Sequence, residues 1–204
     1  MANSTIAYGF RPLGKLGGNP AAGGQDQYVI VDNYSSSIFQ GDIVKLNATG
    51  GVVVVDTSAL SSVLGVFNGC LIESDPSTKK PKWSNFYSQT NITQGEIQAY
   101  VITDPNQLYL VKSTGTALGT TAVGTSFDQV YAAGNTNNGI SGAYLDLSTS
   151  STAANGQVTV VNTSPFIGNE EAVTNEDFIV RVSKSHQLLQ QENINYGYLK
   201  ITTS

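Results

Sequence analysis

The stretch EIQAYVITDPNQLYLVKS, residues 96–113, carries the clearest hairpin signal in the sequence. Residues 97–102 and 108–111 each have the apolar, β-branched and aromatic character of a strand. Between them, Asp104-Pro105-Asn106-Gln107 fits a type I turn, with aspartate in the first position and proline in the second. The stretch therefore predicts two antiparallel strands that pair through this turn.

Similar short strands are expected along most of the chain, separated by glycine-rich and polar turns. A second hairpin is predicted from residues 43–46 and 52–55, after a turn at Gly41-Asp42. Gly65 and Gly69 permit a bulge or a close backbone approach in the next strand. The remaining predicted strands are residues 27–34, 62–70, 143–147, 156–162, 177–185 and 196–202.

The pattern contains almost no helix, and the one short candidate is residues 185–193. Because the strands follow one another without a βαβ rhythm, the sequence predicts an all-β fold. We expect a β-sandwich or barrel of short antiparallel strands with little helix. Residues 1–26 show no sustained period and hold six glycines and two prolines, so they are expected to form an extended N-terminal arm. Residues 27–204 then form the all-β domain, with a division into two β subdomains near residues 113–126 left open.

The composition argues against several functional classes. The 204 residues carry a net charge of −5, and only 12% of them are charged, so no basic surface for nucleic acid is expected. One cysteine and one histidine cannot build a Cys/His zinc site. No window approaches the length of apolar sequence that spans a membrane. We therefore expect no cofactor, no metal, no direct contact with nucleic acid and no membrane segment.

Residues 9–15 spell G-x-x-x-x-G-K, most of a phosphate-binding loop. Such a loop must follow a strand and open a helix, and a hydroxyl must follow its lysine. Here Leu16 follows the lysine, no clear strand precedes Gly9, and the Gly-Gly-Asn-Pro stretch after Leu16 cannot begin a helix. The glycines therefore indicate an extended segment rather than a nucleotide site.

No catalytic constellation emerges from the remaining polar residues. The carboxylates of NEEAVTNED, residues 169–177, lack the ligand spacing of a calcium loop and are read as a solvated loop. His186 has no accompanying nucleophile motif, and Cys70 follows an apolar run typical of an inert buried thiol. The cations and aromatic residues of KKPKWSNFY, residues 79–87, are interpreted as a loop whose aromatic side chains pack or touch a protein partner. We expect no enzymatic activity.

The order of segments resembles that of capsid decoration or cement proteins of tailed bacteriophages. The resemblance is clearest in GFRP (residues 9–12), IFQGDIVKL (38–46) and AYVITDPN (99–106), and it extends to LGVFNGC, FYSQT and DFIVRVSKSHQL. It implies a structural virion protein, made in the host cytoplasm, that binds the outside of the capsid. Such proteins bridge neighbouring major capsid protein subunits and stabilise the head, commonly as homo-oligomers. A trimer is favoured, and a dimer is the alternative.

In this role the arm would make the capsid contact. Tyr8 and Phe10 are the expected anchors for apolar pockets, Arg11 the partner of a capsid carboxylate, and Pro12 the residue that limits the entropy lost on ordering. The arm is expected to be ordered only where a partner supplies contacts. The alternative is a disordered leader without a partner.

Two other functional classes compete with this interpretation. The chain could be a carbohydrate-binding β-sandwich of a virion appendage, with Tyr196 and Tyr198 on one face of the last strand as stacking residues. A polysaccharide-degrading enzyme ranks last. Loss of turnover on changing Glu170 or Glu171 would be its signature.

Overall fold

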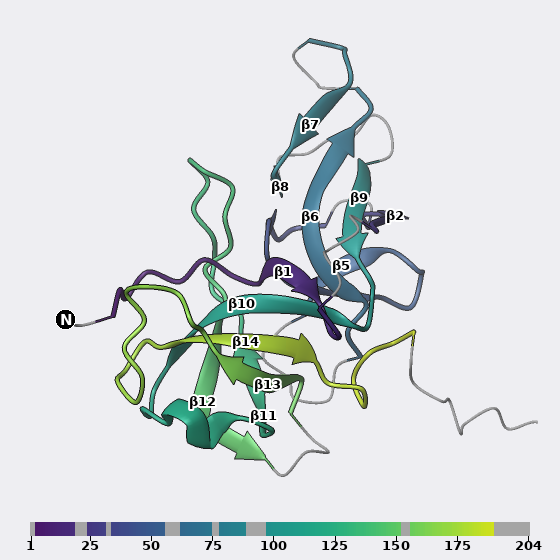
Figure 1. Cartoon of the computed structure of the whole chain (residues 1–204). Helices are drawn as coiled ribbons and strands as arrows, with labels where there is room; N and C mark the ends of the chain where they lie inside the picture. The colour runs from purple at the N-terminus through teal and green to yellow at the C-terminus, as the bar shows by residue number, and fades with distance from the viewer. Residues whose placement is uncertain are drawn as a thin grey trace, which may run out of the picture.

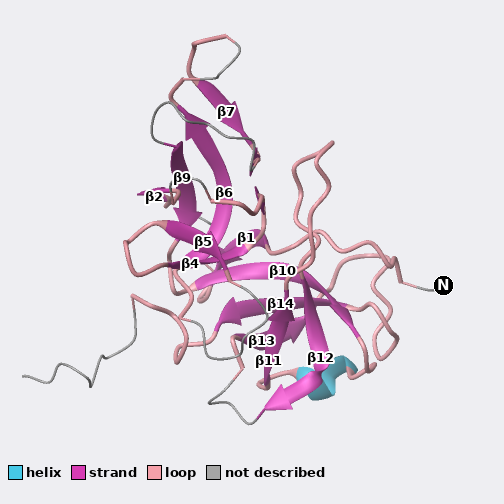
Figure 2. Ribbon diagram, turned by 180° about the vertical axis from the view of Figure 1, so that it is seen from behind, coloured by secondary structure: helices cyan, strands magenta, loops and turns pink. Residues whose placement is uncertain are grey.

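The computed structural model describes residues 3–18, 24–31, 34–55, 62–74, 78–88, 97–151 and 156–189. Within these ranges the regular secondary structure is almost entirely β-strand, which confirms the predicted all-β class. The 3-10 turn η1 (Gly119–Ala122) is the helical segment of the described chain. Figure 1 shows two parts: a closed barrel and a curved sheet, here called the blade, that rises from it. Seen from behind, η1 lies at the end of the barrel away from the blade (Figure 2).

The barrel consists of five strands that close on one another. Strand β10 pairs antiparallel with β14 on one side and parallel with β12 on the other, and β11 and β13 complete the ring. Strand β1 lies antiparallel beside β10 as an added outer strand. The bounds are β1 (Arg11–Lys15), β10 (Gln107–Thr114), β11 (Ser126–Val130), β12 (Tyr144–Ser151), β13 (Val158–Thr163) and β14 (Asp177–Val182).

The blade has the strand order β2-β9-β6-β4-β5, and β7 pairs with the far end of β6. A separate two-stranded sheet of β3 and β8 packs beside β6. The bounds are β2 (Asp26–Val29), β3 (Ile38–Phe39), β4 (Ile43–Leu46), β5 (Val52–Val54), β6 (Gly65–Ile72), β7 (Lys82–Ser84), β8 (Phe86–Tyr87) and β9 (Ile97–Ile102).

The predicted hairpin of residues 97–111 is wrong in its pairing, although both strands and the turn form. Gln107 N–H donates to the Asp104 carbonyl at 3.1 Å, as a β-turn requires. Strand β9 then pairs with β2 and β6 in the blade, whereas β10 pairs within the barrel. The turn therefore carries the chain from one sheet to the other. The segment 113–126, where the sequence leaves a division into two subdomains open, holds the end of β10, η1 and the start of β11.

Two other local predictions are confirmed. Strands β4 and β5 form the predicted hairpin, and the Asn47 side chain accepts hydrogen bonds from the backbone N–H groups of Thr49 and Gly51 in its loop. Gly65 and Gly69 both lie where a side chain would collide with backbone or ring atoms. Gly69 has φ +135° and lies at a register shift between β6 and β9.

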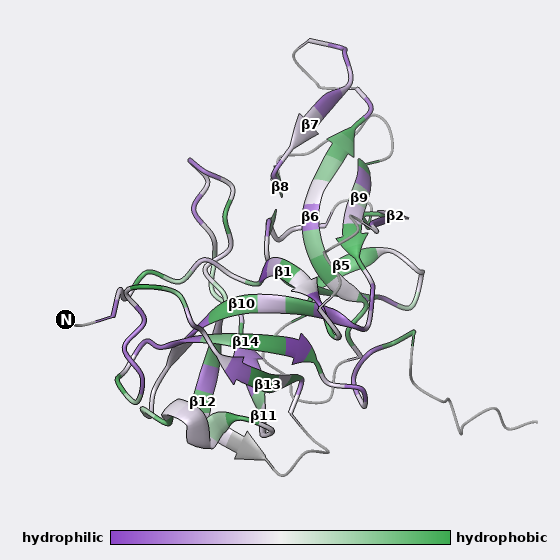
Figure 3. Ribbon diagram, viewed as in Figure 1, coloured by the Kyte–Doolittle hydropathy of each residue, from purple (hydrophilic) through white to green (hydrophobic). Residues whose placement is uncertain are grey.

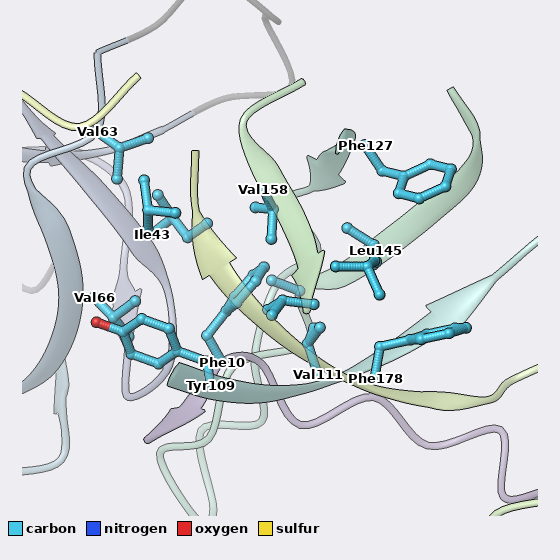
Figure 4. Close-up of a cluster of buried hydrophobic side chains, with 14 of the residues drawn as sticks. Phe10, Ile43, Val63, Val66, Tyr109, Val111, Phe127, Leu145, Val158 and Phe178 are labelled. Carbon is cyan, nitrogen blue, oxygen red and sulfur yellow. The ribbon is translucent and has the colours of Figure 1, made fainter. Parts of the chain in front are cut away.

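Hydrophobic residues are concentrated in the strands of both parts (Figure 3). One core fills the barrel and continues into the foot of the blade through Ile43, Val66 and Ile102. Figure 4 shows this continuity, with Tyr109 lying between Val66 of the blade and Val111 of the barrel. A second core lies within the blade around Phe67. Since one core is shared, the barrel and the blade support each other.

The N-terminal segment is not a free arm in the part that the structure describes. Strand β1 pairs with β10, and Phe10 is only 1% exposed in the shared core. Its ring packs edge-on against Tyr109, with ring centroids 6.3 Å apart. Pro12 is tolerated because β1 is an outer strand, where a missing N–H does not interrupt a ladder. The expectation that this segment is ordered only by a partner is therefore corrected for residues 3–18.

The short helix predicted for residues 185–193 is also wrong in its described part, which forms turns. Residues 183–189 instead fasten the end of the barrel to the blade. Val63 N–H donates to the His186 carbonyl at 2.7 Å, and Leu188 N–H donates to the Val63 carbonyl at 2.8 Å. Gln187 is 1% exposed, and its amide donates to the carbonyls of Leu64 and Thr103.

Substituting Gln187 with leucine is expected to lower the free energy of unfolding by about 1–3 kcal/mol, because two buried carbonyls lose their donor. Urea denaturation of the variant measures this loss. Gln98→Leu is the matched control, since Gln98 is only half-buried. Equal stability of the two variants would contradict the fastening role.

Candidate functional site

The four arm residues singled out from the sequence come together in one cleft. Tyr8, Phe10, Arg11 and Pro12 line a space of about 470 Å³ between the barrel and the blade, here called the junction cleft. The blade and the loop between β11 and β12 supply the other wall. The residues of that wall are Gln40, Gly41, Val66, Phe67, Asn68, Ile102 and Ile140.

Close backbone contact fixes the entry of the N-terminal segment into this cleft. Phe10 N–H donates to the Gly41 carbonyl at 3.0 Å. Gly9 has φ +67°, and a Cβ at this position would lie 2.6 Å from the Ser141 Cβ and 2.8 Å from the Gly41 oxygen. Gly41 itself has φ +96°, in the predicted turn closed by Asp42 N–H donating to the Phe39 carbonyl. Glycine is therefore required on both sides of the contact.

Phe10 and its neighbours have different roles from those expected. Phe10 is part of the chain's own core, so its ring is not available to a pocket on a partner in this conformation. Arg11 is exposed, and its guanidinium lies 5.6 Å from the centre of the Tyr8 ring. Pro12 is exposed beside it. Of the four residues, Arg11 is thus the best placed to meet a ligand.

Two cations, Arg11 and Lys112, lie close to the Tyr8 ring. Lys112 Nζ is 5.8 Å from the ring centre, and it forms a buried ion pair with Asp177 at 2.7 Å. Burial of Tyr8 and the nearby Asp177 carboxylate raise the pKa of its hydroxyl, which therefore stays protonated. The two cations hold the electron-rich ring in place, and Tyr8 in turn supports Arg11 at the surface.

The blade side of the cleft supplies amides and apolar surface. Gln40 Nε2 donates to Asn68 Oδ1 at 2.9 Å, and the apolar side chains of Val66 and Ile102 lie below. Ile140 is 36% exposed at the rim, on a loop that Gln40 holds through the Gly139 carbonyl. None of the described residues that line the cleft is a carboxylate, histidine, cysteine, serine or threonine. The cleft can hydrogen-bond, pair with an anion and bury apolar groups.

No known family, curated protein or solved structure matches the chain.

The remaining sequence candidates have structural surroundings. The residues that spell a phosphate loop form β1, and Lys15 pairs with Asp104 at 2.5 Å. The Glu176 carboxylate is buried and accepts hydrogen bonds from the backbone N–H groups of Gly119 and Ala172. The Asn3 side chain accepts a hydrogen bond from Glu170 N–H in the same loop. No group of three metal-ligating side chains occurs in the described ranges.

Cys70 is a buried free thiol, and burial raises its pKa to about 12, so it is a poor nucleophile. His186 is also buried, with Nδ1 beside the Ser185 hydroxyl. Tyr196 and Tyr198 lie outside the described residues. No helix in the described part of the chain has the length and hydropathy of a membrane span.

Sequence reasoning missed the blade side of the cleft. Gln40 and Asn68 come from segments 28 residues apart, and nothing in either segment marks it as a binding element. The sequence predicts a loop for KKPKWSNFY, residues 79–87, whereas this stretch contains β7 and β8. With three and two residues, these strands are too short to show an alternating pattern that would distinguish them from a loop.

Proposed function

We propose that the chain is a structural virion protein without enzymatic activity. It binds the outer surface of a tailed-phage capsid and bridges and stabilises major capsid protein subunits. One observation carries the proposal: the three segments on which the resemblance rests meet at the junction cleft. Residues 9–12, 38–46 and 99–106 each supply part of its lining. Each of the three segments that resemble decoration proteins thus contributes residues to the same cleft.

The chemistry of the cleft suits a protein segment as its ligand. A partner can place apolar side chains beside Ile140 at the rim, and an acidic side chain can reach the exposed Arg11. Low charge across the chain favours burial of its surface, because interface cores are poor in lysine and glutamate. Several large apolar side chains elsewhere are exposed as further contact points: Ile6, Phe166 and Ile167.

Assembly as a trimer, with a dimer as the alternative, belongs to the same proposal. Trimers suit local threefold positions of an icosahedral shell, where each copy in the trimer contacts a different capsomer. Sedimentation equilibrium of the free protein separates monomer, dimer and trimer.

The Arg11→Ala variant tests the site. We expect at least tenfold weaker binding to purified capsids that lack the protein, because a charge-assisted hydrogen bond contributes about 1.5–3 kcal/mol. Quantitative co-sedimentation over a concentration series measures this affinity. Arg181→Ala is the matched control: Arg181 lies on β14 and is not among the cleft residues.

The melting temperature of each free variant should stay near that of the parent protein, since Arg11 is exposed. Equal capsid affinity of Arg11→Ala and Arg181→Ala would remove the junction cleft from the binding surface.

A further inference from the structure

The outer surface of the blade carries an exposed pair of aromatic rings away from the junction cleft. Trp83 on β7 is 48% exposed, and its ring centroid lies 4.9 Å from that of Tyr100 on β9 at an interplanar angle of 64°. Neither residue lines the junction cleft. Together the two rings form a contiguous aromatic patch, which is more informative than a single exposed apolar side chain.

Strand register places polar side chains on the same surface. Tyr100 lies opposite Gln27 on β2 and opposite Gly69 on β6. One pleat along, Gln98 lies opposite Leu71, which lies opposite Trp83. Cross-strand partners share a face of a sheet. We call Trp83, Tyr100, Gln27 and Gln98 the aromatic face.

Gly69 lets the indole lie close against the sheet. A Cβ on Gly69 would come within 2.5 Å of Trp83 Cζ2, so any side chain there would displace the ring. The indole therefore covers bare backbone with one side, and its exposed area lies on the other. The Tyr100 ring packs against the indole at a steep angle. The result is a flat apolar surface held in one orientation before any ligand arrives.

Hydrogen-bonding groups surround this flat surface. Gln27 Nε2 donates to the Tyr100 hydroxyl oxygen at 3.0 Å, and Gln98 Nε2 donates to Glu73 Oε1 at 3.1 Å. These bonds orient the side chains and leave further capacity, because the Tyr100 hydroxyl can still donate and each glutamine oxygen can still accept. The face thus combines one stacking surface with neutral donors and acceptors at its margin.

We propose that the aromatic face binds a neutral saccharide, with a pyranose ring stacked on Trp83. A pyranose has an apolar C–H face and hydroxyl groups around its edge, which matches an indole bordered by amides and a phenol. Single-stranded nucleic acid also stacks on aromatic rings, but its binding sites add a cationic track for the phosphates. Lys79, Lys80 and Lys82 precede Trp83 in the sequence, but the four residues of the aromatic face are uncharged, Gln98 bonds the Glu73 carboxylate at its margin and the chain has a net charge of −5, which favours a neutral sugar.

This activity is separate from the proposed capsid contact. A decoration protein on the outside of a head could display the aromatic face toward glycans in the surroundings while the junction cleft holds the shell. The two proposals use different residues, so either can fail without the other.

The chain offers a direct readout, because Trp83 is its only tryptophan. The full-length protein is first applied to an array of neutral gluco-, galacto- and manno-oligosaccharides of three to six units. The oligosaccharide with the strongest signal is then titrated while tryptophan emission is recorded. We expect a saturable change in emission.

In calorimetric titration, Trp83→Ala should bind the same oligosaccharide at least tenfold more weakly. Phe166→Ala, which removes another exposed aromatic ring, is the matched control and should bind normally. Tyr100→Phe keeps the ring and removes the hydroxyl, and a severalfold loss is expected even if Trp83→Ala proves unstable.

Three results would overturn the proposal. The first is the absence of any array signal. The second is normal binding by both Trp83→Ala and Tyr100→Phe. The third is a change in Trp83 emission caused by a fifteen-nucleotide oligothymidine or by capsid protein while every neutral sugar is silent.

Discussion

Replacing Phe10 with alanine is expected to lower the free energy of unfolding by about 3–5 kcal/mol, the usual cost of removing a buried phenylalanine side chain. The ring is 1% exposed and packs against Tyr109 in the core that the barrel and the blade share. Its loss would leave a cavity at the point where β1 is fixed to β10. Urea denaturation at neutral pH measures the change.

Leu13→Ala is the matched control for this experiment. Leu13 lies in the same strand but is 37% exposed, so its truncation should change stability by less than about 1 kcal/mol. If Phe10→Ala costs no more than Leu13→Ala, the N-terminal segment is detached in solution. The segment would then be an arm that becomes ordered only when a partner supplies contacts.

The second large effect is a dependence of stability on pH that originates in Asp42. This carboxyl group is fully buried beside the junction cleft, where its oxygens accept from Phe39 N–H at 2.7 Å and from the Ser141 hydroxyl at 2.5 Å. Burial raises its pKa from 3.8 to about 7, and the two hydrogen bonds offset only part of that rise. In the unfolded chain the carboxyl group ionises near pH 4.

Between about pH 4 and pH 7 the folded protein therefore keeps a proton on Asp42 that the unfolded chain has released. The contribution of Asp42 to stability falls as pH rises across this window and is constant above it. The total decrease is roughly 4 kcal/mol at 1.36 kcal/mol per pKa unit. Chemical denaturation at half-unit pH steps measures the slope.

Asp42→Asn should flatten this slope, since asparagine has the same shape and does not ionise. Asp104→Asn is the control: the neighbouring Lys15 and a backbone N–H lower the pKa of Asp104, so its effect belongs below pH 4. An unchanged slope in Asp42→Asn would show that the buried carboxyl group does not govern stability in this range.

The sequence predicts strands better than it predicts which strands pair. Alternating burial along β14 follows directly from its pattern, with Phe178, Val180 and Val182 inside. The β4–β5 hairpin is also local, and its glycine loop fixes the pairing. By contrast, residues 97–102 and 108–111 have the pattern of a hairpin, yet they belong to different sheets. A period of two identifies a strand, but it does not name the neighbour that the strand pairs with.

The candidate site was predictable on one side only. Arg11 and Tyr8 stood out because aromatic and basic residues occur among glycines in a segment without other structure. Their partners across the cleft, Gln40 and Asn68, depend on contacts between segments distant in sequence. The sequence predicts that Phe10 contacts a partner, because residues 1–26 have no period. No local pattern indicates that its ring enters the core of the same chain. Trp83 and Tyr100 meet only through the pairing of β7, β6 and β9.

The most direct test of the proposed function is binding of the purified protein to purified, expanded phage heads that lack it. We predict saturable co-sedimentation with the heads and a higher melting temperature of the decorated heads, since a ligand that binds the assembled state stabilises it. Heads that neither retain the protein at saturating concentration nor melt at a higher temperature would contradict the proposed function.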